Sequence, residues 1–184
     1  MAMAKHIVTK NTMAAALKEL MTERPFSKIS VRDIVERCSM NRNSFYYHFK
    51  DKYDLVNWIF YTEIAEEVTQ FNAEVMPAWE LLNKVFTYFY DNRNFYINAL
   101  SVSGQNSFEE YFIELMGNII RVRTMGVFHD DGHKDFYVNF FADALSSAFL
   151  RWLKDGATIE PEKMTEMIKK ATEGAALYVI SERE

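Results

Sequence analysis

The chain of 184 residues has few residues that interrupt or cross-link a helical fold, with one cysteine, three prolines and six glycines. Few Gly and Pro leave few places to turn, and the many Ala, Leu, Met, Glu and Lys favour helices. The single Cys38 cannot form an internal disulfide, and no apolar leader precedes Lys5 and Lys10, so we expect a cytoplasmic protein. No apolar run approaches the roughly 20 residues of a membrane span. We therefore expect a membrane-free, all-α protein.

Charge is unevenly distributed along the chain. Residues 1–54 hold ten Lys and Arg against six Asp and Glu, a balance of +4, so the total of −5 leaves −9 for residues 55–184. Such asymmetry hints that the basic segment contacts nucleic acid. The 49% of hydrophobic residues is too high for a disordered chain, so a packed core is expected. We predict one domain over 1–54 and a second over 55–184.

The basic segment is predicted to hold three helices. Apolar residues at spacings of three and four favour a helix over 8–24, which Pro25 ends. Ser30 precedes a second helix over 31–38 and Asn41 a third over 42–49, because both residue types cap helix N-termini. Two short helices across a tight turn form a helix-turn-helix, whose second helix enters the DNA major groove.

The remaining 130 or so residues are also predicted to be helical. Asp51 can cap a long helix that runs toward Val75, and Pro77 marks its end. Apolar periodicity, with glycines at the breaks, predicts further helices over 78–92, 94–101, 107–126, 134–155 and 161–181.

The segment over residues 25–60 reads PFSKISVRDIVERCSMNRNSFYYHFKDKYDLVNWIF. It resembles the N-terminal domain of TetR-family transcriptional regulators, most specifically in NRNSFYYHFKDKYDL. The resemblance implies a three-helix helix-turn-helix domain followed by a helical ligand-binding and dimerisation domain. Within the family the segment is similar to the subgroup related to the dihydroxyacetone kinase operon regulators, which implies a partner protein and an activator as one possibility; a repressor with a small ligand is the other.

Two positions depart from the family pattern. The turn carries Cys38-Ser39 where the family commonly has Ala-Gly, so a residue with a Cβ must accept the φ that the turn requires. Asn43 stands where the family usually has a small Gly or Ala, which affects the transfer of base contacts to that position.

The candidate DNA-binding residues lie on and around the third helix. Arg42 and Asn43, on its first turn, suit base edges because Arg pairs with guanine and Asn with adenine. Donors suited to the phosphate backbone follow at Ser44, Tyr46, Tyr47, His48 and Lys52. Lys28 and Ser30, near the N-terminus of the second helix, are also expected beside phosphates. Arg32 of that helix is expected at a base or a phosphate, as the matching position can be in the family. Phe45 and Phe49 are expected in the core. Of the two adjacent tyrosines, we expect Tyr46 to face DNA and Tyr47 to pack.

The acidic region offers an aromatic cluster and two apolar helix faces. An effector pocket is one interpretation of the cluster and ordinary core is the other; its candidate residues are Trp79, Phe86, Tyr90, Phe108, Tyr111 and Phe112. In the family the last two long helices form a dimer interface, and packing within one monomer is the alternative; the candidate residues are Phe141, Leu145, Ala148, Phe149, Trp152, Ile168, Ala171, Ala175 and Tyr178. For His129, Asp130, Asp131 and His133 we favour a solvated loop over a metal site.

The sequence therefore predicts a homodimeric regulator that binds a palindromic double-stranded DNA operator. A small ligand or a partner protein at the C-terminal domain would control it. No catalytic motif or strand pattern supports an enzyme, and no cofactor is expected. The alternative is a helical interaction protein, or co-regulator of the same fold, that has lost DNA binding, because the total charge is negative.

Overall fold

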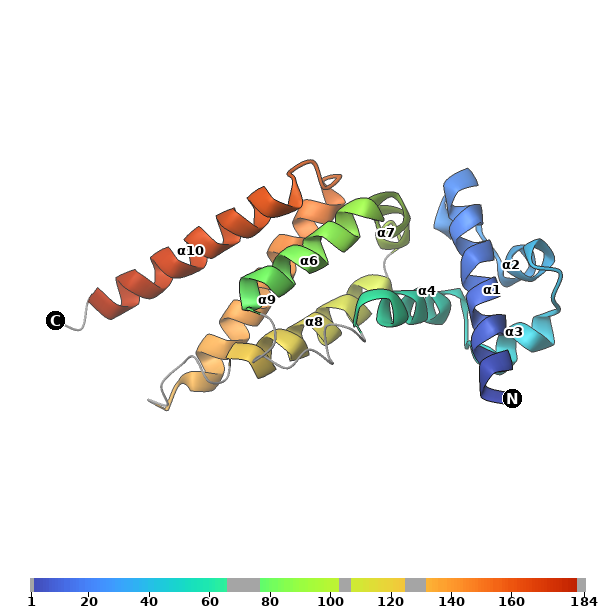
Figure 1. Cartoon of the computed structure of the whole chain (residues 1–184), viewed down its shortest axis with the longest axis horizontal. Coiled ribbons are helices and arrows are strands. Elements are labelled where there is room, and N and C mark those ends of the chain that lie inside the picture. The colour runs from blue at the N-terminus through green and yellow to red at the C-terminus, as the bar shows by residue number, and fades with distance from the viewer. Residues whose placement is uncertain (1, 66–76, 103–106, 125–131, 182–184) are drawn as a thin grey trace. The chain divides into compact units, whose positions relative to one another are not determined.

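The computed structural model describes residues 2–65, 77–102, 107–124 and 132–181 (Figure 1). Within these ranges every regular element is a helix, which confirms the predicted all-α fold. The N-terminal elements are α1 (Ala2–Glu23), the 3₁₀ helix η1 (Phe26–Lys28), α2 (Val31–Arg37), α3 (Arg42–His48), α4 (Lys52–Phe60) and a π-helical turn η2 (Tyr61–Ala65). The C-terminal elements are α6 (Ala78–Asp91), α7 (Arg93–Leu100), α8 (Phe108–Thr124), α9 (Lys134–Lys154) and α10 (Pro161–Ser181).

Most helices lie within a few residues of their predicted ranges, and three features differ. Helix α1 begins six residues earlier than predicted, and η1 was not predicted. The predicted helix toward Val75 begins at Lys52 but becomes π-helical at Tyr61, and its continuation beyond residue 65 lies outside the described residues. None of the helices in the described ranges has the length and apolar character needed to cross a membrane.

The chain divides into two compact units. The first comprises Met1–Glu66 and Asn94–Phe112, and the second Glu67–Arg93 and Ile113–Glu184. The predicted boundary at residue 54 falls inside α4, so the functional division at that residue stays a prediction. Helix α7, which follows the predicted DNA-binding domain by more than 30 residues, is grouped with it.

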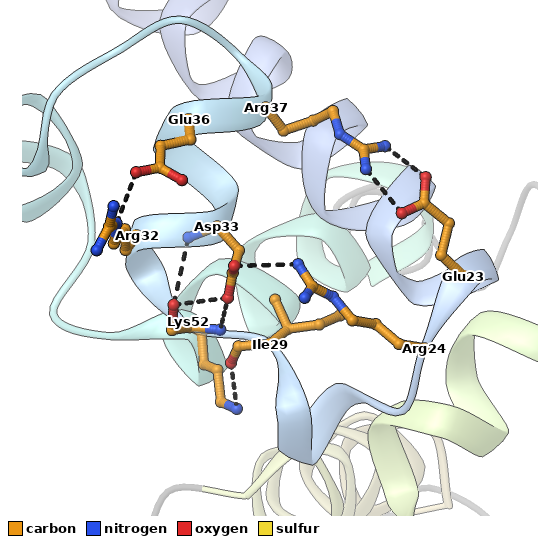
Figure 2. Close-up of polar contacts among 9 residues, drawn as sticks. Glu23, Arg24, Ile29, Arg32, Asp33, Glu36, Arg37 and Lys52 are labelled. Carbon is orange, nitrogen blue, oxygen red and sulfur yellow. Dashed lines mark hydrogen bonds and ion pairs between the residues drawn. The ribbon is translucent and has the colours of Figure 1, made fainter.

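The first unit packs α1 against α2 and α4, and α2 against α3 (Figure 1). Polar contacts reinforce the junction of α1 with α2, as Figure 2 shows. Arg37 Nη1 and Nη2 donate to the two carboxylate oxygens of Glu23, each at 2.7 Å. The Arg24 guanidinium lies 3.1 Å from Asp33 Oδ1. Because these pairs are partly exposed, they fix geometry more than they add stability.

Aromatic packing dominates the second unit. Phe86 of α6 stacks on Phe149 of α9 with ring centroids 4.8 Å apart and meets the edge of Trp152 at 4.9 Å. Phe89 approaches the same Phe149 ring at 4.8 Å. Rings of this size bury enough apolar area to dominate the energetics of a small core. Helix α10 packs along α6 and completes the unit.

Candidate nucleic-acid interface

A sharp turn joins α2 to α3 and sets the direction of the second helix. The Ser39 N–H donates to the Glu36 carbonyl at 3.2 Å, and the Met40 N–H donates to the Val35 carbonyl at 2.8 Å. This pair of bonds is a Schellman motif, which requires a left-handed residue after the helix end. Ser39 adopts that conformation with φ of 54°. The expectation that a residue with a Cβ occupies a strained turn position is therefore confirmed.

Helix α2 begins with a reciprocal capping box. The Ser30 hydroxyl oxygen accepts the Asp33 N–H at 3.3 Å, and Asp33 Oδ2 accepts the Ser30 N–H at 2.8 Å and its hydroxyl at 2.6 Å. These bonds to Ser30, followed by the Arg24 charge, lower the pKa of Asp33 to about 2. The box therefore stabilises a helix of seven residues that could not persist alone.

Helix α3 is anchored through two phenylalanines. Asn41 Oδ1 caps its first turn by accepting the Ser44 N–H at 2.8 Å. Phe45 and Phe49 are buried, with their rings 5.6 Å apart, and the Phe49 ring lies 5.7 Å from Trp58 of α4. Both phenylalanines are thus core residues, as predicted. Their burial leaves the opposite side of α3 facing solvent.

The solvent side of α3 carries the predicted base-contacting residues. Arg42 and Asn43 are exposed on the first turn, and Ser44 is half-buried. Tyr46 and Tyr47 are 56% and 72% exposed, so the expectation that Tyr47 packs inside is wrong. Phe45 and Phe49 already supply the packed face of this short helix, which leaves both tyrosines on its flanks. We call Arg42, Asn43, Tyr46 and Tyr47 the α3 edge.

His6 of α1 extends the surface beside the α3 edge. Its ring centroid is 5.4 Å from Tyr47 and 5.2 Å from His48. Lys10, one turn later on α1, places Nζ 5.1 Å from the Phe49 ring centroid. Burial lowers the pKa of His48, and the charges of His6 and Lys10 lower it further. His6 and Lys10 were not among the predicted DNA-contacting residues, because their spacing of four on α1 does not reveal that they lie beside Tyr47, His48 and Phe49.

The predicted contacts around α2 are mostly engaged within the protein. Lys28 is exposed at the end of η1. The Ser30 side chain belongs to the capping box, and Arg32 Nε donates to Glu36 Oε1 at 2.6 Å (Figure 2). That hydrogen bond raises the pKa of Arg32. Both Arg32 and Glu36 are exposed, so a phosphate can compete for the guanidinium.

Lys52, which was predicted to bind phosphate, is bonded within the protein. Lys52 Nζ donates to the carbonyl oxygen of Ile29 at 2.7 Å (Figure 2). It also donates to the carbonyl oxygen of Phe26 at 2.8 Å and lies 4.5 Å from the Phe26 ring centroid. Burial lowers the pKa of this lysine. The ammonium of Lys52, the first residue of α4, satisfies two carbonyls of the chain between α1 and α2. Lys52 thus joins α4 to the chain between α1 and α2, and its contact with phosphate stays a prediction.

The six predicted pocket residues fall into both units and pack as core or against polar partners. Phe86 lies in the aromatic core of the second unit, Trp79 is half-buried, and the Tyr90 hydroxyl donates to Glu160 Oε1 at 2.8 Å. In the first unit, Phe60 of α4 meets Phe108, Phe112 and Tyr111 at ring-centroid distances of 5.5, 5.8 and 6.2 Å. The effector pocket stays a prediction.

The predicted dimer residues have different environments. Phe149, Trp152 and Ile168 are buried within the subunit, at 3%, 4% and 7% exposure, so the interface prediction does not hold for them. The reason is that α6 and α9 join their aromatic faces inside one chain. Phe141, Leu145 and Ala148 are half-buried and Ala171 is exposed, whereas the side chains of Ala175 and Tyr178 lie outside the described residues.

The predicted loop at 129–133 is only partly described. His129, Asp130 and Asp131 lie outside the described residues, and His133 is exposed at the N-terminus of α9. Elsewhere in the described ranges, no three His, Cys, Asp or Glu side chains gather closely enough to hold a metal ion.

Comparisons with known proteins agree with this helix-turn-helix geometry. Residues 14–59 match the family profile described as bacterial regulatory proteins, tetR family. Residues 78–174 match a second profile, described as a transcriptional regulator C-terminal region and named for the same family. A curated relative is the HTH-type dhaKLM operon transcriptional activator DhaS of Lactococcus lactis subsp. lactis (strain IL1403), at 29% identity over 118 residues. The match covers 64% of this chain and 62% of that relative.

Solved structures share the fold. The dihydroxyacetone kinase operon activator DhaS superposes with a TM-score of 0.69 at 24% identity, over 90% of this chain and 94% of that one. A TetR transcriptional regulator from Streptococcus agalactiae 2603V gives 0.66 at 21% identity, over 91% and 97%. Because the two profiles match both the helix-turn-helix and most of the C-terminal region, this chain belongs to the TetR family of bacterial regulatory proteins.

Proposed function

We propose that this protein is a transcription regulator that binds double-stranded operator DNA through the α3 edge. The observation that carries the proposal is the two-sided character of α3: its phenylalanines are buried while Arg42, Asn43, Tyr46 and Tyr47 face solvent. Long donors on the first turn of a helix that follows a tight turn suit base edges in the major groove. The tyrosine hydroxyls and His48 then follow the phosphates.

Operator binding would use a homodimer on a palindromic site. Helix-turn-helix proteins read two half-sites about one helical turn apart, which requires two copies of the reading helix. Support for a dimer surface comes from Phe136 and Phe140 of α9, which are exposed and stack with ring centroids 6.3 Å apart. Adjacent exposed phenylalanines mark a surface that gains from burial. The exposed Ala171 of α10 is a further candidate for this interface.

The C-terminal region would receive the regulatory signal. The Lactococcus relative is named as an activator of the dhaKLM operon. We infer from that name and from the shared fold that activation with a partner protein is one mode for this chain, beside repression relieved by a small ligand. In vitro transcription from the bound promoter separates the two, because an activator raises and a repressor lowers transcript yield.

The test of DNA binding is selection of sites from a random duplex pool, followed by titration of the selected operator at several salt concentrations. The parent is expected to recover a palindromic site and to lose affinity steeply as salt rises. Arg42→Ala should weaken binding by about 1–3 kcal/mol and relax the base preference at its contact. Arg151→Ala, which removes an exposed arginine of α9, is the matched control and should bind like the parent.

Lys52→Ala distinguishes positioning from phosphate contact. Because the Lys52 ammonium bonds to the carbonyls of Phe26 and Ile29, its loss should weaken operator binding without changing the salt slope. A slope reduced by about one would instead show a direct phosphate contact. Recovery of no DNA sequence by the parent would reject the proposed function in favour of a protein-interaction module of the same fold.

A further inference from the structure

Two helix ends meet at Pro25 without caps of their own. Helix α1 ends at Glu23, and the carbonyls of a last helical turn have no partner within the helix. The Arg24 N–H takes one of them, the Leu20 carbonyl, at 3.1 Å. The following helix η1 begins at Phe26, and its N-cap Pro25 makes no side-chain cap hydrogen bond. Carbonyls of α1 and an N–H of η1 therefore need partners from another element.

The carboxamide of Asn98, in α7, forms hydrogen bonds to the end of α1 and to the start of η1. Its Nδ2 donates to the carbonyls of Met21 and Arg24 at 3.0 and 3.2 Å, and its Oδ1 accepts the Phe26 N–H at 2.7 Å. The side chain is half-buried, which strengthens these bonds relative to exposed ones. Asn98 is thus at once the C-cap of α1 and the N-cap of η1, although it lies more than 70 residues away in sequence.

The same segment is also bonded by a side chain of α4. Lys52 Nζ donates to the Phe26 carbonyl, so the N–H and the C=O of Phe26 are bound by side chains from α7 and α4 respectively. The Phe26 ring is fully buried and meets the edge of Tyr53 at 5.3 Å. From Ile29, the other carbonyl bound by Lys52, the chain passes directly into the capping box of α2. The position of α2 relative to α1 therefore depends on Asn98 and Lys52.

Helix α7 is joined to α6 by a braced corner. Asn92 Nδ2 donates to the Tyr88 carbonyl at 2.9 Å, and Arg93 Nη1 donates to the Tyr90 carbonyl at 2.7 Å. The Arg93 guanidinium also lies 4.5 Å from the Tyr90 ring centroid. These contacts restrain the chain where α6, in the second unit, passes into α7. A movement of α6 would therefore be passed along a short, braced stretch of chain to Asn98.

We propose that Asn98 is a positioning residue through which the C-terminal region sets the operator affinity of the α3 edge. This inference rests on the proposed function and deepens it. When the Asn98 carboxamide engages Met21, Arg24 and Phe26, the turn between α1 and α2 is held in the reading conformation. A ligand or partner that displaces α7 would release this turn and lower operator affinity without contacting DNA. Linkage then requires that operator binding, in return, stabilises α7.

Two variants and one control test the role of the carboxamide in operator binding. Asn98→Ala removes all three bonds and should raise the operator Kd on the order of tenfold, with the salt slope unchanged because no phosphate contact is lost. Asn98→Asp keeps an acceptor for the Phe26 N–H but sets a carboxylate oxygen against the Met21 and Arg24 carbonyls. It should weaken binding at least as much as Asn98→Ala. Asn94→Ala, at an exposed position of the same helix, should bind like the parent.

Hydrogen–deuterium exchange on the full chain tests the linkage directly. In the parent, the selected operator should slow exchange in α3, in residues 21–29 and in α7. In Asn98→Ala, the operator should still protect α3 but no longer α7. The comparison with and without operator in the parent needs no variant, so it decides the proposal even if Asn98→Ala fails to fold.

Several outcomes would overturn the inference. One is that Asn98→Ala binds the operator with the affinity of the parent. Another is that, in the parent, the operator slows exchange in α3 but not in α7. Asn98→Ala could lower the thermal unfolding midpoint and still bind the operator with the parental Kd at a temperature well below that midpoint. That result would show that Asn98 only stabilises the fold. Parental binding by Asn98→Asp would overturn the part played by the bonds to α1. Absence of any DNA binding by the parent is a separate result that rejects the proposed function itself.

Discussion

The two units of the protein hold their helices by different means. In the first unit, α2, α3 and α4 have seven to nine residues each, and side-chain oxygens of Ser30, Asn41 and Asp51 cap their N-termini. In the second unit, α6 and α9 have 14 and 21 residues, and their N-cap residues Pro77 and His133 make no side-chain cap hydrogen bonds. Short helices cannot persist without caps, whereas long ones are held by their packed faces.

The difference shows where precision is needed. The reading helix α3 must present its edge at a fixed angle, and directional hydrogen bonds at Asn41 and at the Ser39 turn specify that angle. The second unit needs a cohesive core, which stacked rings supply without fixing each end. Substitutions in the two units should therefore separate stability from DNA affinity.

The largest expected effect is the loss of a ring from the second unit. Phe149→Ala removes a side chain that packs on Phe86, Phe89 and Trp152, and should lower the free energy of unfolding by about 3–5 kcal/mol. Chemical denaturation followed by circular dichroism measures it. Val122→Ala, in α8, is the control, since Val122 is 74% exposed, and should change stability little. Equal effects of the two substitutions would contradict the assignment of the core.

Removal of the α3 cap should lower stability only slightly but should weaken operator binding measurably. Asn41→Ala deletes the acceptor of the Ser44 N–H and should cost about 1 kcal/mol of stability. Because the first turn of α3 carries Arg42 and Asn43, the operator Kd should rise several-fold at the same time. Operator titration at a temperature well below the unfolding midpoint measures this rise. Asn11→Ala, at an exposed position of α1, should leave the Kd unchanged; if both variants bind like the parent, the cap does not position the α3 edge.

Acid should weaken the first unit through Asp33. Its pKa is lowered from an ordinary value of 3.8 to about 2, so its contribution is complete above about pH 4 and is lost as pH falls toward 2. After solvent screening the contribution is on the order of 1 kcal/mol. Asp33→Asn should therefore destabilise the protein at pH 6 and by much less at pH 2.5. Denaturation at both pH values tests this, and an equal loss at both would rule out the carboxylate as the cause.

The smallest expected effect concerns the two left-handed helix ends. Ser39 in the first unit has φ of 54°, and Gly156 at the end of α9 has φ of 89°. Ser39→Gly should stabilise the protein by about 0.5 kcal/mol, because relief of the strain exceeds the added entropy of the unfolded chain. Gly156→Ala should destabilise it by about 1 kcal/mol. Thermal unfolding of both variants measures the contrast, and a destabilised Ser39→Gly protein would contradict this reading of the turn.

The sequence alone predicted where the helices lie and which residues of α3 are buried. Apolar spacing placed Phe45 and Phe49 inside, and N-cap residues marked the starts of α2 and α3, because both signals are local. It was insufficient where residues distant in the chain meet. The periodicity of α4 does not reveal that Lys52 reaches the Phe26 carbonyl, 26 residues earlier. The contacts of Asn98 with the end of α1 have no local signal either.

For Phe149 and Trp152 the interface prediction failed for a related reason. Phe149 and Trp152 lie on a broad apolar face that suits either a partner subunit or the subunit's own core. Periodicity reports that such a face is buried but not by what. The structure shows that α6 covers these rings, which leaves Phe136 and Phe140 as the exposed aromatics of α9.

The most direct test of the central claim, that the α3 edge reads DNA, is photo-crosslinking to the selected operator. A photoreactive phenylalanine analogue is placed at Tyr47 on the α3 edge and, in a second protein, at Val122 of the second unit; both side chains are exposed. If the α3 edge reads DNA, position 47 should crosslink efficiently to bases or sugars within each half-site and position 122 should not. A crosslink from position 122, with none from position 47 in protein that still binds the operator, would contradict this claim.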